Sequence, residues 1–262
     1  MSRPGLWSAA ALLLLGLAAC GNGAPGPTPT TAPASSPADA PDARADLAAK
    51  ATLAQDHAFA ALYSLDDGHG AARNVVATTG ADGTWRVDVS GGALGGTADV
   101  SIVSTAAGVY QCTMSSSQQP ITPTCVRVAD PGKPVPTDYD PQVERLFRQW
   151  LSVFTDRTAP LSVAVVQPLN GAKGTCYSVD SIAAALSAPV DVGIYCYADD
   201  GLLTAARVDF GTLTLVSTGA GPATVPLPGP EVQGQPMGMG SPPPPSTTNV
   251  PSGIPSDAPS AQ

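Results

Sequence analysis

Residues 73–89 read RNVVATTGADGTWRVDV, and they set the fold class of this chain. Apolar side chains recur with a period of two on either side of a glycine-rich turn, GADG, at residues 80–83. In the second half, WRVDV, the three apolar side chains share one face, and Arg86 and Asp88 share the other. This pattern predicts a β-hairpin with one buried face and one solvated face.

Short segments of the same kind follow along most of the chain. We expect further strands at residues 98–102, 109–113, 161–167, 175–179, 192–197, 202–210 and 212–217. Many glycines stand at the ends of these segments, where they are expected to curve the sheet. The expected fold is mainly β with α (α+β): a curved antiparallel sheet, or half-barrel, covered by one or two helices.

Two stretches show helical spacing of their apolar residues instead. An alanine-rich helix is expected over residues 46–62, and a second helix is expected to begin with Asp140 as N-cap and Pro141 as its first residue. Glu144 and Arg148 lie four residues apart on the polar side of that second helix, which predicts a surface ion pair. Its apolar stripe contains Phe147, Trp150, Leu151 and Phe154. Core packing explains this stripe most simply, but in a hollow half-barrel the same side chains would form the wall of a ligand pocket.

The N-terminus carries the signature of a bacterial lipoprotein. An apolar run at residues 6–17 leads to the sequence LAAC, which ends at Cys20. The run is about 12 residues long, and a spanning helix needs about 20, so it fits a signal peptide better than a membrane anchor. We therefore expect residues 1–19 to be a removed signal peptide. Cys20 would carry diacylglycerol and hold the mature protein on the outer face of the cell membrane.

Low-complexity segments flank the expected domain on both sides. Residues 20–42 are rich in Gly, Pro, Ala, Ser and Thr, which predicts a disordered tether behind the lipidated cysteine. Residues 229–262 are rich in Pro, Gly and Ser, which predicts a disordered tail. The remaining residues, 43–228, are enough for one half-barrel ectodomain with a core of its own.

Four further cysteines lie within that domain, at Cys112, Cys125, Cys176 and Cys196. An even number of cysteines outside the cytoplasm predicts two disulfides, for which three pairings are possible. We expect the sequential pairing, because residues 110–113 and 123–126 have the pattern of two arms of one hairpin. The chain has no Cys-x-x-Cys motif, so a zinc site built from these thiols is not expected.

Charge and motif content exclude several function classes. The net charge is -9 and the basic residues are scattered, which argues against nucleic-acid binding. The chain has two histidines, His57 and His69, and neither lies near a Gly-x-Ser-x-Gly motif. Asp66, Asp67 and His69 could ligate a metal, but a solvated turn is the simpler interpretation. We therefore expect no catalytic residues, no metal and no cofactor.

Three blocks near the end of the domain resemble known envelope lipoproteins: GTCYSV at residues 174–179, YCYADDGLLT at 195–204 and FGTLTL at 210–215. They resemble a group of actinobacterial envelope lipoproteins. The last two blocks are also similar to the final strands of LolA-like half-barrels, including the LprG and LppX group of mycobacterial lipoproteins. The resemblance covers about the last third of the domain, and two disulfides depart from that pattern. It implies a sheet that cups an acyl-chain ligand by its apolar lining, without a short binding motif.

These observations lead to two hypotheses about function. The first is a membrane-anchored extracytoplasmic lipoprotein that binds a lipid or glycolipid in a cavity between sheet and helix, with the residues 147, 150, 151 and 154 in its wall. The alternative is an adaptor without a cavity, which would dock on another protein of the cell envelope. Sequence alone does not separate them, because the same residues line a cavity and a core.

Overall fold

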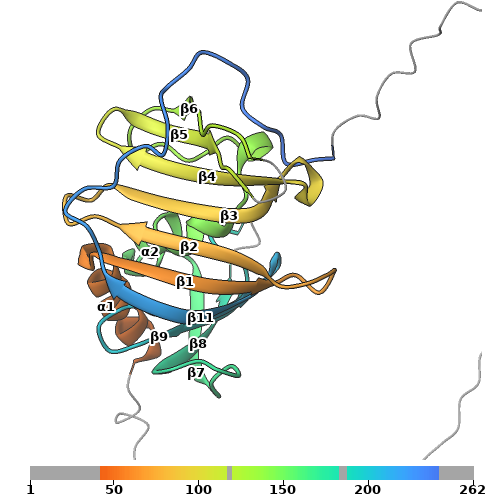
Figure 1. Ribbon diagram of the computed structural model, residues 1–262. Coiled ribbons are helices and arrows are strands. Elements are labelled where there is room, and N and C mark those ends of the chain that lie inside the picture. Colours follow the sequence, from red (N-terminus) through yellow and green to blue (C-terminus); the bar gives the residue numbers. More distant parts are fainter. Residues whose placement is uncertain (1–41, 117–119, 183–187, 242–262) are drawn as a thin grey trace, which may run out of the picture. The chain divides into compact units, whose positions relative to one another are not determined.

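Eleven strands form one antiparallel sheet in the computed structural model, which describes residues 42–116, 120–182 and 188–241. They are β1 (Phe59–Asp66), β2 (Arg73–Thr79), β3 (Trp85–Ala93), β4 (Ala98–Thr105), β5 (Gly108–Thr113), β6 (Cys125–Ala129), β7 (Leu161–Val166), β8 (Thr175–Ser181), β9 (Gly193–Tyr197), β10 (Leu203–Val208) and β11 (Gly211–Ala220). The strands lie in the order β6-β5-β4-β3-β2-β1-β11-β10-β9-β8-β7 (Figure 1). The expected curved, mainly β fold is thus confirmed, whereas its family is not identified by this architecture.

The strand order follows from two meanders that meet at β1. The first runs outward from β1 to the edge strand β6. The chain then crosses one face of the sheet to the opposite edge, β7, and a second meander returns from there to β11, which pairs with β1. The crossing segment contains two 3₁₀ turns, η3 (Thr137–Tyr139) and η4 (Val143–Leu146), and the helix α2 (Gln149–Thr155).

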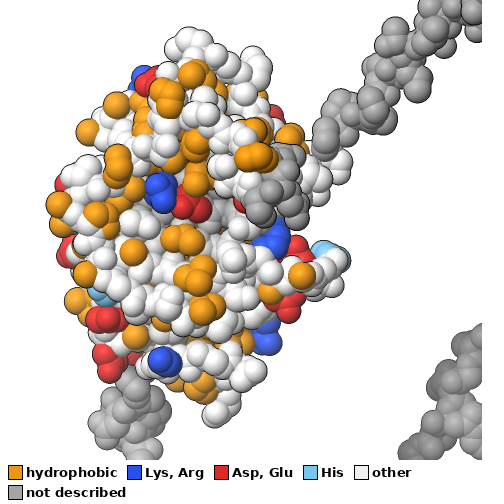
Figure 2. All heavy atoms as spheres, viewed as in Figure 1, with side chains coloured by type: hydrophobic (Ala, Val, Ile, Leu, Met, Phe, Trp, Pro, Cys, Tyr) orange, Lys and Arg blue, Asp and Glu red, His pale blue; other side chains and the backbone are white. Residues whose placement is uncertain are grey.

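The main core fills the space between the sheet and the helices. In β3 the side chains of Val87 and Val89 are buried in this core, while Arg86 and Asp88 form an ion pair of 3.0 Å on the other face. The hairpin expected from the sequence at residues 73–89 is therefore confirmed. Figure 2 shows the outer face of the sheet, where apolar and polar side chains are mixed and acidic and basic groups are scattered.

The N-terminal helix is shorter than the sequence predicted. α1 spans Ala43–Asp56, and the chain from Phe59 onward forms β1 instead of continuing the helix to residue 62. β1 alternates buried and partly exposed residues and pairs with a neighbour on each side. Two strand partners override the helix propensity of the alanines at residues 58–61.

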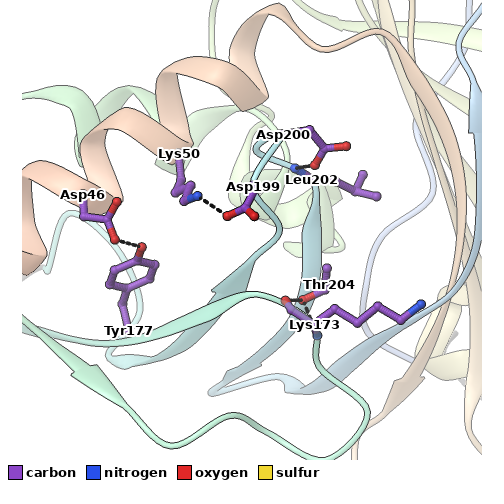
Figure 3. Close-up of polar contacts among 8 residues, drawn as sticks. All are labelled: Asp46, Lys50, Lys173, Tyr177, Asp199, Asp200, Leu202 and Thr204. Carbon is purple, nitrogen blue, oxygen red and sulfur yellow. Dashed lines mark hydrogen bonds and ion pairs between the residues drawn. The ribbon is translucent and has the colours of Figure 1, made fainter.

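α1 is attached to β8 and to the turn between β9 and β10 by two polar contacts (Figure 3). The hydroxyl of Tyr177 donates a hydrogen bond of 2.5 Å to Asp46 Oδ2, and Lys50 Nζ lies 2.8 Å from Asp199 Oδ1. Gly201 closes the turn after Asp199 with φ at +85°, and a Cβ at this position would lie 2.5 Å from the backbone nitrogen of Ala54. The turn packs directly against the helix, so only glycine fits there.

The second helix also differs from its prediction. Asp140 does not cap a continuous helix: its Oδ1 accepts a hydrogen bond of 2.6 Å from the nitrogen of Gln142, whose φ is +68°. This left-handed residue interrupts the helix, so η4 forms first and α2 begins only at Gln149. Pro141 consequently precedes a 3₁₀ turn and not an α-helix.

Both disulfides have the sequential pairing. Cys112–Cys125 joins β5 to β6 and Cys176–Cys196 joins β8 to β9, with Cα–Cα distances of 4.0 and 3.9 Å. They lie outside the main core, in two small buried clusters of their own. Each disulfide therefore ties together two strands at one margin of the sheet.

The folded unit extends beyond Pro228, where the sequence predicted a disordered tail. Residues 221–241, here called the strap, run from the end of β11 past β6 to the turn after β3 (Figure 1). Glu231 pairs in parallel with Cys125 at the β6 edge. The side chain of Gln111 bonds the backbone of Met237 twice, at 2.8 Å to its oxygen and 2.5 Å from its nitrogen. Residues 229–241 thus satisfy backbone groups of the sheet, which composition does not reveal.

The expectations for both ends of the chain fall outside the described residues. These are the signal peptide at residues 1–19, lipidation at Cys20, almost all of the tether at 20–42, and the tail from residue 242. Within the described part, the helices are too short or too polar to cross a membrane.

Candidate functional site

A cleft of about 310 Å³ lies between the first meander and the crossing segment. Its lining comes from β3, β4 and β5, from the loop after β6, and from η4 and α2. The lining residues are Trp85, Ser104, Val109, Gly132, Lys133, Pro134, Val135, Glu144, Arg148, Gln149 and Ser152. The cleft therefore lies between sheet and helix, as the sequence-based hypothesis requires, but its walls are both apolar and charged.

Glu144 is the buried polar group of the cleft. The residue is only 4 % exposed, and its Oε2 has no hydrogen-bond partner among the described residues. Burial, the negative charge of Asp140 and a hydrogen bond to Asp140 together raise the pKa of Glu144 well above its ordinary value of 4.5. Glu144 consequently keeps its proton under conditions in which an exposed glutamate is ionised.

Asp140 lies next to Glu144 and is held by other groups. Arg145 Nε donates a hydrogen bond of 2.8 Å to Asp140 Oδ2, and a second guanidinium nitrogen of Arg145 contacts the same oxygen. The nitrogen of Gln142 bonds the other carboxylate oxygen. Both oxygens of Asp140 are thus engaged, so this residue positions Glu144 and is not a free base facing the cleft.

Arg148 contributes a cation to the cleft and also joins two neighbouring elements. Its guanidinium donates hydrogen bonds to the carbonyl oxygens of Gly83, at 3.1 Å, and Gln55, at 3.5 Å. Burial lowers the pKa of this guanidinium from its ordinary value. The surface ion pair expected between Glu144 and Arg148 is not formed, because Glu144 is buried beside Asp140 and the cation reaches backbone oxygens instead.

The four residues expected to form a pocket wall lie in the core. Phe147, Trp150, Leu151 and Phe154 are each 5 % exposed or less. Trp150 and Phe154 pack edge-to-face on Tyr195, with ring centroids 5.9 and 5.1 Å away. Next to Phe147 and Leu151 there is a cavity of about 10 Å³, roughly the space of one water molecule. None of the four lines the 310 Å³ cleft.

No protein-family model matches this chain, and no curated protein matches it. The arrangement of the cleft is therefore interpreted from its own residues.

The turn considered as a metal site is held together by its own hydrogen bonds. Asp66 and Asp67 accept hydrogen bonds from the nitrogens of Gly68 and His69, each at 2.9 Å, and Asp67 forms an ion pair with Arg73 at 3.0 Å. No group of three or more His, Cys, Asp or Glu side chains in the described part of the chain is arranged to hold a metal ion.

Sequence reasoning missed most of the cleft. Glu144 and Arg148 are spaced by four residues, and this spacing predicts a surface ion pair instead of a cleft wall. Lys133 and Val135 belong to a loop without periodicity, and only the tertiary structure brings them opposite Trp85.

Proposed function

We propose that this protein is an extracytoplasmic lipoprotein, anchored to the outer face of the cell membrane through Cys20, which binds an amphiphilic ligand between sheet and helix. The ligand class is a lipid or glycolipid, and the cleft receives the end of the molecule that carries its polar group.

The observation that supports this proposal is the cleft itself. Its volume of about 310 Å³ lies at the lower end of the range of small-molecule sites, roughly 300–1,000 Å³. Trp85, Val109 and Val135 offer apolar surface, and a buried carboxyl group lies among them. A site with apolar walls and a few convergent polar groups suits a molecule that is itself apolar at one end and polar at the other.

Apolar contact would supply most of the affinity, at about 25 cal/mol per Å² of surface removed from water. The polar groups would set the orientation of the ligand. The core side chains of α2 would support the cleft wall from behind without touching the ligand, which places binding on the opposite side of the helix from the residues that the sequence suggested.

The test is mass spectrometry of organic extracts from the mature chain, residues 20–262, secreted by an actinobacterial host and purified without detergent. It carries Cys20→Ser, so that its own acyl chains do not compete for the cleft. Wild type is expected to release one lipid class reproducibly and in stoichiometric amount. Ser152 is exposed and lines the cleft, so the larger side chain in Ser152→Trp is expected to fill it. This variant is expected to be purified without bound lipid.

Ser162→Trp serves as the matched control, because Ser162 is exposed on β7 and does not line the cleft. This variant is expected to carry the same lipid as wild type. If Ser152→Trp and Ser162→Trp both stay loaded, the lipid is bound elsewhere and the proposed site is wrong.

An adaptor function is the second candidate, and the filled core favours it. The space beside Phe147 and Leu151 holds about 10 Å³, so an acyl chain enters there only if α2 moves. A wild-type protein that is empty, under conditions in which a known lipid carrier is recovered loaded, would support the adaptor and contradict ligand binding.

A further inference from the structure

The cleft carries positive charge on a protein that is acidic overall. The chain has 12 basic and 21 acidic residues, for a net charge of -9. Among the eleven lining residues, all of which the structure describes, three have ionisable side chains: Lys133, Glu144 and Arg148. Two of the three are cations, so the composition of the cleft is opposite to that of the chain.

The acidic member of this set does not cancel the two cations. Burial and the negative charge of Asp140 raise the pKa of the Glu144 carboxyl group, which favours its neutral form. Arg145 is occupied by Asp140 and does not line the cleft. A ligand in this cleft therefore meets two positive charges and a carboxyl group whose neutral form is favoured by burial.

The buried oxygen of Glu144 also indicates that a polar partner is missing. Buried polar atoms are almost always hydrogen-bonded, because an unpaired one loses its bonds to water and gains none in return. Oε2 of Glu144 has no such partner within the described residues, and its side chain forms part of the cleft surface. Because Glu144 shares its proton with Asp140, Oε2 is an acceptor, so its missing partner is a hydrogen-bond donor and not the oxyanion of a ligand.

We infer that the cleft binds the oxyanion head group of its ligand, a phosphate or a carboxylate, between Lys133 and Arg148. This inference rests on the proposed function and specifies the ligand as an anionic amphiphile. The apolar part of the ligand lies against Trp85, Val109 and Val135, which share the cleft with the cations.

Cationic and uncharged ligands fit this arrangement less well. A cationic head group would be repelled by Lys133 and Arg148. An uncharged head group would leave the two cations partly desolvated without a counter-charge. An oxyanion satisfies both cations, since hydrogen bonds between charged partners are stronger than those between neutral ones.

The experiment is calorimetric titration of the mature chain carrying Cys20→Ser with four probes: octyl phosphate, octanoate, 1-octanol and inorganic phosphate. The two anionic amphiphiles are expected to bind at least about tenfold more tightly than 1-octanol, as one charge-assisted hydrogen bond implies. Inorganic phosphate is expected to bind more weakly than octyl phosphate, because it gains no apolar contact.

Two cleft variants then locate the charge preference. Lys133→Gln is the principal one, since Lys133 is exposed on a loop and its loss leaves the core intact. It is expected to weaken binding of octyl phosphate by about tenfold and to leave 1-octanol unchanged. Arg148→Gln is expected to act in the same direction, although it also removes the bonds to Gly83 and Gln55. Lys173→Gln and Arg157→Gln, at exposed positions outside the cleft, are expected to bind as wild type.

Each other outcome overturns one of the two proposals. Equal binding of octyl phosphate and 1-octanol, unchanged in Lys133→Gln, would contradict the oxyanion site and leave ligand binding standing. Inorganic phosphate binding as tightly as octyl phosphate would support the oxyanion site and contradict the amphiphilic ligand. Failure of all four probes to bind would contradict both.

Discussion

The carboxyl groups of Asp140 and Glu144 are hydrogen-bonded to each other beneath the cleft, and Arg145 holds Asp140 from its other side. Two carboxylates this close do not both ionise readily, so the arrangement stores one proton on Glu144. The left-handed residue Gln142 lies between the two in the chain, and α2 begins five residues after Glu144. The charge state of the pair therefore bears on the wall of the cleft as well as on the ligand.

Glu144 makes the stability of the fold depend on pH. Its pKa is raised above 4.5 in the folded chain, so the folded state holds a proton that the unfolded state releases. Glu144 therefore makes its full contribution to the stability of the folded state below pH 4.5, and this contribution is lost as the pH rises through the raised pKa of Glu144. Glu144→Gln mimics the protonated acid and cannot ionise. We expect its melting temperature to exceed that of wild type by an amount that grows between pH 5 and pH 8, as measured by differential scanning fluorimetry. Asp138→Asn changes an exposed neighbouring residue, and its melting temperature is expected to follow that of wild type over this pH range. If the melting temperatures of Glu144→Gln and wild type differ by the same amount at every pH, the prediction is wrong.

Gly201 is expected to be necessary for the attachment of α1. Gly201→Ala combines a positive φ with a Cβ 2.5 Å from the nitrogen of Ala54, so either the turn or the helix must shift. Gly68→Ala is the matched control, since φ is +74° and no atom lies within 4 Å of its Cβ. Strain in Gly68→Ala should lower the free energy of unfolding by about 1–2 kcal/mol. The decrease for Gly201→Ala, measured by urea unfolding, should be larger. Equal losses would show that α1 does not constrain the turn.

Gln111 is expected to hold the strap against the sheet. Its amide bonds the backbone of Met237 twice and also donates to the carbonyl of Tyr139, at 3.2 Å. Gln111→Leu leaves these backbone groups unpaired, at a cost of about 1–3 kcal/mol each if they stay buried. Separation of the strap avoids that cost, so hydrogen exchange at Met237 and Met239 should become fast. Gln167→Leu, at an exposed position, should leave exchange unchanged. Protection that persists in Gln111→Leu would show that the backbone bonds of the strap suffice.

The parts of the fold that the sequence predicts are those set by local pattern. The hairpin at residues 73–89 alternates clearly, and the turn at 199–201 has the residues that a tight turn needs. The cysteine pairing could be predicted because Cys112 and Cys125 each lie in a strand-like segment on opposite sides of one loop. In these cases neighbouring residues carry enough information, since the period and the turn chemistry act over a few positions.

The parts that could not be predicted depend on contacts between distant segments. Residues 58–61 favour a helix in isolation, and pairing with β2 and with β11, about 160 residues later, makes them a strand. The strap has no side-chain pattern, because it is held mainly through backbone groups. In the same way, Glu144 reads as a solvated residue until burial beside Asp140 changes its charge.

Substitutions on α2 are expected to separate its core side from its cleft side. Leu151 is 2 % exposed in the core, so Leu151→Asp buries an unpaired carboxyl group and should unfold the domain. Phe154→Ala should lower the free energy of unfolding by roughly 3–5 kcal/mol in urea, because the cavity beside Tyr195 cannot close fully.

Ser152→Asp changes the exposed residue next to Leu151 and should leave the free energy of unfolding within about 0.5 kcal/mol of wild type. It adds a negative charge to the cleft that Lys133 and Arg148 also line. It is expected to weaken octyl phosphate binding on a folded protein. A folded Leu151→Asp protein that loses its lipid while Ser152→Asp keeps it would return the ligand to the core side of the helix, and the cleft would then have no part in binding.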